Sequence, residues 1–339
     1  MMSGESPRER IVGLLRRPRT PLLLAPMAAL THAGLRTLVD ELGGCDLHFS
    51  EMISAEGLTR STPYERYYTS ELPDGERLIF QLVGYSHARI VDAAAKLAES
   101  GAAGIDVNMG CSAPHIVRKG GGIAWMSDAS RAAALLRDLR DAVGEKSLSV
   151  KLRLGTTDEI EPLVRLCRGL EEAGADFVTL HPKRRNEGSA RRARWSYVAR
   201  LRDELTIPVV GNGGVADYAT LCTRLEQGGP GPVMIGRAAA RAPWIFRYLS
   251  GRIGRGAVEY RVDLLSVADR FFELLEEHQP ADFHPTRARR FLPYFTANLA
   301  FGHSLGARLA QEGSYERAKA EIRSYFREHP DARDHVERT

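Results

Sequence analysis

Short apolar runs alternate with longer amphipathic stretches along most of this chain. Each of eight runs has the length and composition of a buried strand. The eight runs are residues 22–25, 46–50, 77–81, 104–108, 149–152, 176–180, 208–211 and 233–235. The stretches between most of them carry apolar residues at helical spacing, most clearly over residues 88–100, 130–143 and 161–172. Gly101, Gly144 and Gly174 follow these three stretches, at the position where a left-handed residue often ends a helix.

The eightfold alternation of strand and helix predicts a (β/α)₈ TIM barrel over residues 21–250. A doubly wound parallel sheet is the alternative architecture for such a pattern. No strand run is followed by the GxGxxG turn that a dinucleotide-binding sheet of that kind would need. We therefore expect the barrel.

The pattern changes on either side of the predicted barrel. Residues 1–20 are polar and basic, and we expect a tail or a short helix there. Residues 251–260 are basic and rich in glycine, which indicates a linker, and residues 261–330 are helical in pattern. The last helix carries its apolar stripe at Tyr315, Ala318, Ile322 and Tyr325. We expect a small helical C-terminal domain whose aromatic residues form its core.

The composition is that of an ordinary globular protein. The 339 residues are 43% hydrophobic and 27% charged, which is enough apolar material for a full core. No apolar run reaches the roughly 18 residues of a membrane span, and the first residues do not resemble a signal peptide. These features predict a cytoplasmic protein.

The four cysteines, Cys45, Cys111, Cys167 and Cys222, are far apart in the chain. None belongs to a pair with the spacing of a zinc site, so we expect neither disulfides nor a structural metal. Cys45, Cys167 and Cys222 have the surroundings of buried core residues. Cys111 differs because it lies beyond a strand end, on a glycine turn.

Polar residues follow several of the predicted strands at the point where each strand ends. Asn108 ends the fourth run and Cys111 follows it, Lys151 lies at the end of the fifth, and His181 follows the sixth. The carboxyl ends of the strands of a TIM barrel meet at one face, and active sites are built there. These side chains are therefore candidates for a shared active site.

Glycine-rich turns follow the seventh and eighth strands. Asn212, Gly213 and Gly214 form the first turn, and Gly236 and Arg237 form the second. Barrels often bind a phosphate between these two loops, because glycine lets backbone N–H groups approach the phosphate oxygens. Arg237 can add a charged contact. The two turns together predict a phosphorylated cofactor.

The net charge is only +4, but positive residues are clustered. The largest cluster comprises Lys183, Arg184, Arg185, Arg191, Arg192 and Arg194, with Glu187 as its one acid. Two smaller clusters are Arg118 with Lys119, and Arg287 with Arg289 and Arg290. A single cluster is often only a solvated face, whereas three near one active-site rim favour a polyanionic partner.

With these motifs in place, the chain resembles the tRNA-dihydrouridine synthases over about residues 20–250. The matching segments are APMA at 25–28, SEMISA at 50–55, QL at 81–82, NMGC at 108–111, VKLRLG at 150–155, His181, PVVGNG at 208–213, MIGR at 234–237 and APWIF at 242–246. The helical C-terminal region also suits this family. Three positions depart from its usual pattern: Ser112 replaces a proline, Gly214 an aspartate, and residues 182–185 read PKRR where GRTR is expected.

The resemblance implies an FMN cofactor at the mouth of the barrel, with NADPH as the reductant. Hydride would pass from reduced FMN to C6 of a uridine in tRNA, and Cys111 would donate the proton to C5. The residues implied at the cofactor are Pro26, Met27 and Ala28 along the ring, Gln81 and Lys151 at its polar edge, His181 near ring and substrate, and Asn212, Gly213, Gly214, Gly236 and Arg237 at the phosphate. The residues expected on the RNA side are Asn108, Arg118, Lys119, Lys183, Arg184, Arg185, Arg287, Arg289 and Arg290.

Two other functions remain possible at this point. One is an FMN enzyme acting on a free pyrimidine, similar to the dihydroorotate dehydrogenases, but a small substrate needs no basic clusters. The other is a non-catalytic RNA-binding relative, but such a protein would not need Cys111 or the phosphate-binding glycines, and this chain has both.

Overall fold

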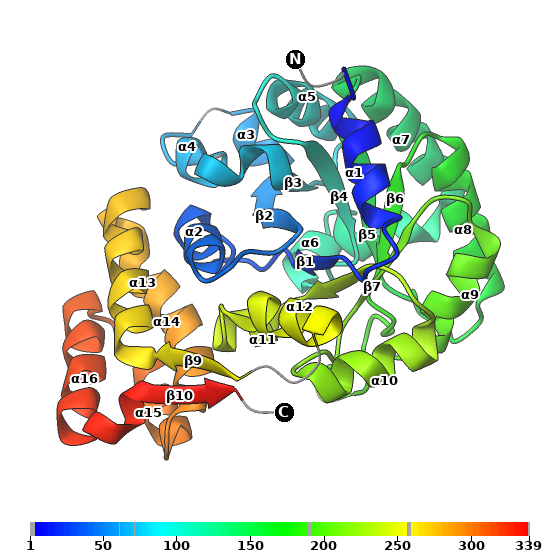
Figure 1. Ribbon diagram of the computed structural model, residues 1–339. Helices are drawn as coiled ribbons and strands as arrows, with labels where there is room; N and C mark the ends of the chain where they lie inside the picture. The colour runs from blue at the N-terminus through cyan, green and yellow to red at the C-terminus, as the bar shows by residue number, and fades with distance from the viewer. Residues whose placement is uncertain (1–3, 61, 71, 189–190, 256–258, 338–339) are drawn as a thin grey trace.

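A closed barrel of eight parallel strands forms the main body of the computed structural model, which describes residues 4–60, 62–70, 72–188, 191–255 and 259–337 (Figure 1). The strands are β1 (Leu22–Leu24), β2 (Leu47–Ser54), β3 (Leu78–Val83), β4 (Gly104–Met109), β5 (Ser147–Leu152), β6 (Phe177–Leu180), β7 (Val209–Asn212) and β8 (Val233–Ile235). Each strand pairs with the next in the chain, and β1 pairs with β8 through Leu23 and Met234. The predicted TIM barrel is confirmed, and the doubly wound alternative is excluded.

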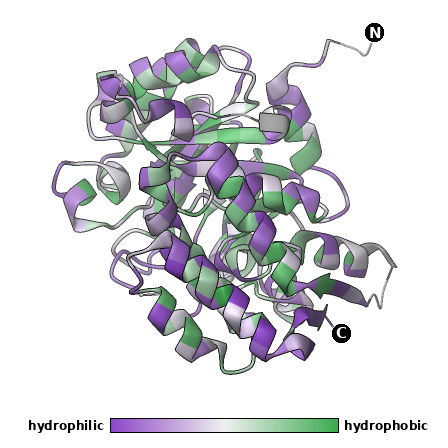
Figure 2. Ribbon diagram, turned by 90° about the vertical axis from the view of Figure 1, so that its left-hand side faces the viewer, coloured by the Kyte–Doolittle hydropathy of each residue, from purple (hydrophilic) through white to green (hydrophobic). Residues whose placement is uncertain are grey.

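Helices surround the barrel and cover the outer faces of the strands. The longer ones are α2 (Ala33–Glu41), α5 (His87–Ala98), α7 (Ala129–Val143), α8 (Glu161–Glu172), α9 (Ser196–Glu204), α10 (Tyr218–Gly228) and α12 (Ile245–Arg255). Shorter helical turns are α3 (Ala55–Leu58), α4 (Glu65–Tyr68), η1 (Leu72–Arg77), α6 (Pro114–Val117), η2 (Gly122–Ser127) and α11 (Arg237–Arg241). Hydrophilic and hydrophobic residues alternate along the helices that face the viewer in Figure 2, as expected for helices with one buried face.

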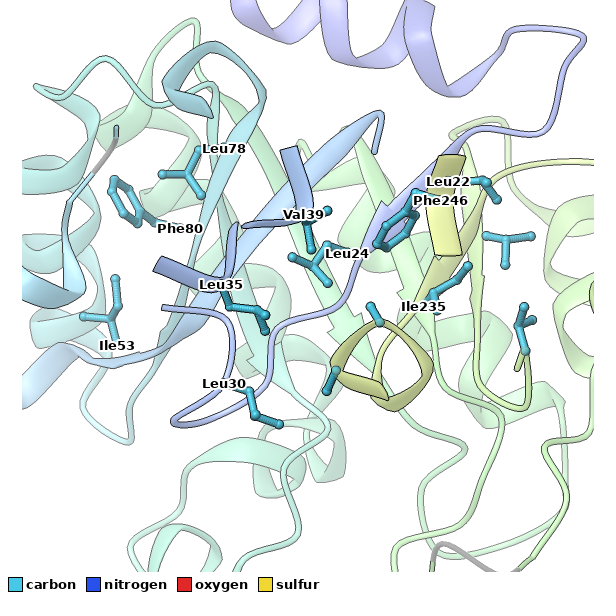
Figure 3. Packing of buried hydrophobic residues seen from close by; sticks show 14 of the residues in the cluster. Leu22, Leu24, Leu30, Leu35, Val39, Ile53, Leu78, Phe80, Ile235 and Phe246 are labelled. Atoms are coloured by element: carbon cyan, nitrogen blue, oxygen red, sulfur yellow. The ribbon is translucent and has the colours of Figure 1, made fainter. Parts of the chain in front are cut away.

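The core between strands and helices follows from this patterning. Leu24 of β1 packs in one cluster with Leu35 and Val39 of α2 and with Phe246 of α12 (Figure 3). The second core cluster fills the inside of the barrel and contains Phe49 and Phe177, whose rings meet edge to face. These two layers leave the carboxyl ends of the strands as the open end of the barrel.

The N-terminal residues form a helix, α1 (Pro7–Leu15), which is one of the two forms predicted for this segment. Ser6 and Glu9 form a capping box at its start, which satisfies two backbone N–H groups that would otherwise lack partners. Ile11 and Leu15 are buried against the cluster inside the barrel. The helix therefore closes the end of the barrel opposite the strand carboxyl ends.

The C-terminal region is a bundle of helices with a two-stranded sheet. The helices are α13 (Leu264–His278), η3 (Ala281–Phe283), α14 (His284–Phe295), η4 (Thr296–Asn298), α15 (Gly302–Leu309), α16 (Tyr315–Glu328) and η5 (Pro330–Arg333). The sheet pairs β9 (Tyr260–Asp263) with β10 (Asp334–Glu337) in antiparallel register. Phe271, Phe291 and Phe295 stack in the core of this bundle, as the sequence predicts. None of the described helices is both long and apolar enough to cross a membrane.

Two details differ from the expectation for this region. The predicted linker at 251–260 is largely structured, since α12 continues to Arg255 and β9 begins at Tyr260. Residues 256–258, which the prediction also covers, lie outside the described residues. In α16 the last residue of the buried stripe is Phe326, where the sequence predicted Tyr325. Tyr325 is half-buried, and its hydroxyl donates a hydrogen bond to the carbonyl of Ala300.

The helical domain docks on the barrel at several places (Figure 1). Helix α13 packs against α2, where a Cβ on Gly34 would lie only 2.9 Å from the carbonyl oxygen of Leu274. On α14, the guanidinium of Arg287 forms an ion pair with Glu51 of β2 at 2.7 Å, and both side chains are buried. Helix α14 also packs against α11, at the open end of the barrel. The helical domain thus forms part of that open end.

Candidate active site

A cavity of about 560 Å³ opens at the carboxyl ends of the strands. Pro293, Tyr294 and Ala297 of the helical domain line one side of it, and loops of the barrel line the rest. The residues predicted from the sequence that line it are Pro26, Met27, Asn108, Cys111, Lys151, His181, Asn212, Gly213, Gly214, Gly236 and Arg237. One cavity therefore unites side chains from six strand ends.

Cys111 is held on a short loop after β4. The side-chain oxygen of Asn108 accepts hydrogen bonds from the backbone N–H groups of Gly110 at 3.1 Å and Cys111 at 2.8 Å. The carbonyl of Cys111 accepts from Ile123, and a Cβ at Gly122 would lie 2.4 Å from that carbonyl oxygen. The loop is thus fixed from both sides, and it presents a half-buried thiol to the cavity.

Lys151 brings a positive charge into the cavity from the end of β5. Burial lowers the pKa of its ammonium to about 8, although the nearby carboxylate of Asp106 acts in the opposite direction. Among the described residues, none accepts a hydrogen bond from its Nζ atom. A buried cation of this kind favours a negatively charged or strongly polar ligand.

His181 lies beside Lys151 and is held as a neutral imidazole. Burial, together with the positive charges of Lys151 and Arg153, lowers the pKa of His181 to about 2. A Cβ on Gly213 would lie 2.8 Å from the His181 ring, so only glycine leaves room for the ring there. The imidazole can therefore donate or accept a hydrogen bond at neutral pH without adding charge.

The loops after β7 and β8 form the far side of the cavity. Gly213 and Gly214 have φ angles of 112° and 75°, which favour glycine and turn the backbone back on itself. The amide of Asn212 donates to the carbonyl of Met234 at 2.8 Å and so ties the ends of β7 and β8 together. Arg237, the first residue of α11, is exposed at the rim. The pair of loops has the geometry of an anion-binding site.

Several residues of the cavity were not among the sequence-predicted site residues. Arg153 lines it and packs against Gly110 of the Cys111 loop, where a glycine Cβ would lie 3.4 Å from its Cγ. Its position two residues after Lys151 was an available signal, since alternate residues near a strand end point the same way. Tyr294 and Arg241 gave no such signal, because their place depends on how the chain folds back onto the barrel.

Two residues expected at the cofactor are not among those that line the cavity. Gln81 is fully buried, and its amide donates to Asp106 and accepts from Asn108. Ala28 is exposed. Contact of either residue with the cofactor stays a prediction.

The basic residues expected on the RNA side divide into two groups. Those that are exposed or half-buried are Arg118, Lys119, Arg184, Arg185, Arg289 and Arg290. The other two, Lys183 and Arg287, are buried. Lys183 donates to the carbonyl of Gly188, and Arg287 pairs with Glu51 at the domain interface. Their contact with RNA stays a prediction, and the exposed residues are the better candidates for it.

Comparison with known proteins gives consistent matches. Residues 23–288 match the model of the family described as dihydrouridine synthase (Dus). A probable tRNA-dihydrouridine synthase of Rhodobacter capsulatus is 31% identical over 88% of this chain and 87% of its own length. The tRNA-dihydrouridine synthase B of Escherichia coli is 30% identical over 70% of this chain and 74% of its own. Among solved structures, a 2-naphthoyl-CoA reductase shares the fold, with a TM-score of 0.53 and 12% identity over 70% of this chain and 50% of its own.

Proposed function

Because the chain belongs to the dihydrouridine synthase family, we propose that it reduces uridines of tRNA to 5,6-dihydrouridine. The observation that carries this proposal is the single cavity that unites the thiol of Cys111, the ammonium of Lys151 and two glycine loops. A thiol supplies a proton, a buried cation favours electron-rich groups, and paired glycine loops favour a phosphate. These are the parts that reduction of a pyrimidine with a phosphorylated redox cofactor requires.

FMN is the cofactor that these residues fit. The loops of Gly213 and Gly214 with Arg237 would hold its phosphate, and the partly buried ammonium of Lys151 would lie at the polar edge of its ring. Pro26 and Met27 provide an apolar surface for a flat ring. When bound, FMN would take a hydride from NADPH and supply it to C6 of the uracil.

The side chains of the cavity divide the remaining work. The Cys111 thiol would give its proton to C5, so that the uracil gains one hydride and one proton, and solvent would return the proton to sulfur. Lys151 would stabilise negative charge at the ring edge, and neutral His181 would hold a carbonyl by donating a hydrogen bond. The helical-domain residue Tyr294 would cover the base from the other side of the cavity.

RNA would reach the cavity across the exposed basic residues around its rim. Arg118 and Lys119 lie after the Cys111 loop, Arg185 follows His181, and Arg290 lies on the helical domain. Contacts to phosphate position an RNA without reading its sequence. A uridine must leave its stack to enter the cavity, which costs a few kcal/mol and is easiest in a loop.

The test is to map dihydrouridine by position in tRNA from a strain that lacks this gene. The wild-type gene should restore dihydrouridine at the positions that lost it. The Cys111→Ala variant should restore about 100-fold less, because it lacks the proton donor, while it still binds flavin. Cys222→Ala, which alters a half-buried thiol outside the cavity, is the matched control and should restore the wild-type level. Unaltered tRNA in the deleted strain would contradict the proposal.

A further inference from the structure

The barrel contains a run of buried polar side chains that the proposed reaction does not itself use. Asp106 of β4, Gln81 of β3 and Ser149 of β5 are all fully buried on neighbouring strands. Buried polar groups of this kind are costly unless each finds a partner. Here they form one connected set, and it leads to the Cys111 loop.

The set begins at the carboxylate of Asp106. The hydroxyl of Ser149 donates to its Oδ1 atom at 2.6 Å, and the amide of Gln81 donates to its Oδ2 atom at 2.7 Å. Burial raises the pKa of Asp106 to about 6, which leaves it ionised at neutral pH. An ionised carboxylate only accepts hydrogen bonds, so it selects the orientation in which Gln81 turns its NH₂ group toward Asp106.

The orientation of Gln81 then determines that of Asn108. Because the NH₂ group of Gln81 donates to Asp106, its side-chain carbonyl oxygen faces Asn108. The NH₂ group of Asn108 donates to that oxygen at 2.9 Å. The remaining hydrogen of that group points to the sulfur of Met52 at 3.2 Å. The side-chain oxygen of Asn108 therefore faces the backbone N–H groups of Gly110 and Cys111. If either amide were reversed, donors would face donors along this chain of bonds.

We propose that Asp106 is a positioning residue, which acts through Gln81 and Asn108 to hold the Cys111 loop in place. Asp106 does not line the cavity, so its influence on the thiol is indirect. The role of Cys111 as proton donor rests on the proposed function. The hold on the loop rests on the hydrogen bonds alone and can be measured without RNA.

The first experiment measures hydrogen exchange of the Cys111 amide by mass spectrometry, on flavin-loaded protein without RNA. Gln81→Met keeps the side-chain volume and removes both hydrogen bonds, and it should raise the exchange rate at Gly110 and Cys111 by about tenfold or more. Asp106→Ala breaks the same chain from its other end and should have the same effect. Asp106→Asn still offers an acceptor to Gln81 and should restore most of the protection.

Ser149→Ala is the matched control for this experiment. It removes the other hydrogen bond of Asp106 but leaves the path to Cys111 intact, so exchange at Cys111 should stay at the wild-type rate. Peptides from α7 and α8 report whether a variant has loosened the whole barrel. The inference is overturned if Gln81→Met and Asp106→Ala, with these peptides unchanged, both keep the wild-type protection of Cys111.

The second experiment separates positioning from general stability through kinetics. Gln81→Met should lower kcat for uridine reduction about 10- to 100-fold, because a misplaced donor slows the step in which it reacts. The KM for tRNA should change by no more than about twofold. A rise in the KM for tRNA with an unchanged kcat would also overturn the inference. If wild-type protein reduces no tRNA, the proposed function fails, while the exchange result still decides the positioning role.

Discussion

At the scale of single residues, the cavity concentrates positive charge where the fold gives it little compensation. Lys151, Arg153 and Arg237 all act on His181, and each lowers the pKa of its imidazole. Burial lowers the pKa of Lys151 to about 8, so its positive charge carries a cost in the folded protein. A charged residue in such a position lowers the stability of the protein, and it is useful only when a ligand binds to it.

Replacing Lys151 with methionine should make the cofactor-free protein more stable at neutral pH. The pKa of Lys151 falls from 10.5 to about 8 on folding, so below pH 8 the folded state holds a buried charge at a penalty. Between about pH 8 and 10.5 the unfolded state binds more protons, and the free energy of unfolding of the wild type rises with pH. The free energy of unfolding of Lys151→Met should therefore exceed that of the wild type by about 1–3 kcal/mol at pH 7. The difference between the two proteins should be smaller at pH 9.5.

Urea unfolding followed by circular dichroism, at pH 7 and pH 9.5, measures this difference. Lys119→Met, which alters an exposed lysine, is the control and should match the wild type at both values. Equal stabilities of Lys151→Met and wild type at pH 7 would show that the ammonium carries no penalty. The same variant should bind flavin more weakly, since it loses the charge at the ring edge.

At the scale of elements, α14 carries one arginine of the domain interface and another of the proposed RNA side. Arg287 is buried against Glu51 and the rings of Tyr68 and Phe283, whereas Arg290 is exposed. One basic cluster in the sequence therefore contains residues with two different physical roles. The distinction leads to opposite expectations for the two residues.

Arg287→Leu should lower the free energy of unfolding by about 3 kcal/mol, because it leaves Glu51 buried without its partner. It should leave the salt dependence of tRNA binding unchanged. Arg290→Leu should do the reverse: stability stays within about 0.5 kcal/mol, and the slope of log K against log salt falls by about 0.7–0.9. Urea unfolding and tRNA binding at several salt concentrations test both variants. A lower salt slope for Arg287→Leu would return that residue to the RNA interface.

At the scale of the whole molecule, exposed basic residues lie on both the barrel and the helical domain. Within the largest cluster, Arg184 is paired with Asp158 and Glu187, so much of its charge is already compensated. Arg185 and Arg192 are exposed, and no ion pair joins either of them to a described residue. These two are the better candidates for phosphate contacts.

The double variant Arg185→Ala with Arg192→Ala should lower the salt slope of tRNA binding by about 1–2, or roughly one for each lost phosphate contact. Arg184→Ala is the comparison, and we expect a much smaller change. NADPH oxidation by oxygen should be unaffected in both, because the flavin site is not altered. If the double variant keeps the wild-type slope, the RNA crosses another part of the rim.

The barrel was predictable because its signals are local. Each strand and helix is set by the spacing of apolar residues within one short segment, and a repeated right-handed β–α unit leaves few other topologies. The same reasoning placed Lys151 and His181 at one end of the barrel. Strand β2 extends beyond its predicted end because it contains the polar residues Ser50 and Glu51, which hydrogen-bond inside the fold.

Three of the predicted site residues have internal partners that the sequence does not show. The amide of Gln81 donates to Asp106, and Arg287 pairs with Glu51, which lies far from it in the sequence. Lys183 is folded back onto the carbonyl of Gly188. Charge and polarity show what a side chain prefers, but the available partners depend on contacts between distant segments. Whether a polar side chain faces solvent, a ligand or an internal partner is therefore seen only in the folded structure.

The pairing of β9 with β10 gives the helical domain a single point of attachment in the chain. Asp263 and Asp334 are direct neighbours across that small sheet, so the 264–333 segment leaves and returns at one place. A segment with adjacent ends can be exchanged for another of different length without moving the barrel that it follows. The replacement segment must still supply a cationic partner for Glu51. It must also place backbone against Gly34, where the carbonyl of Leu274 now lies. Chimaeras between relatives should therefore tolerate large changes in the outer helices and few at these two contacts.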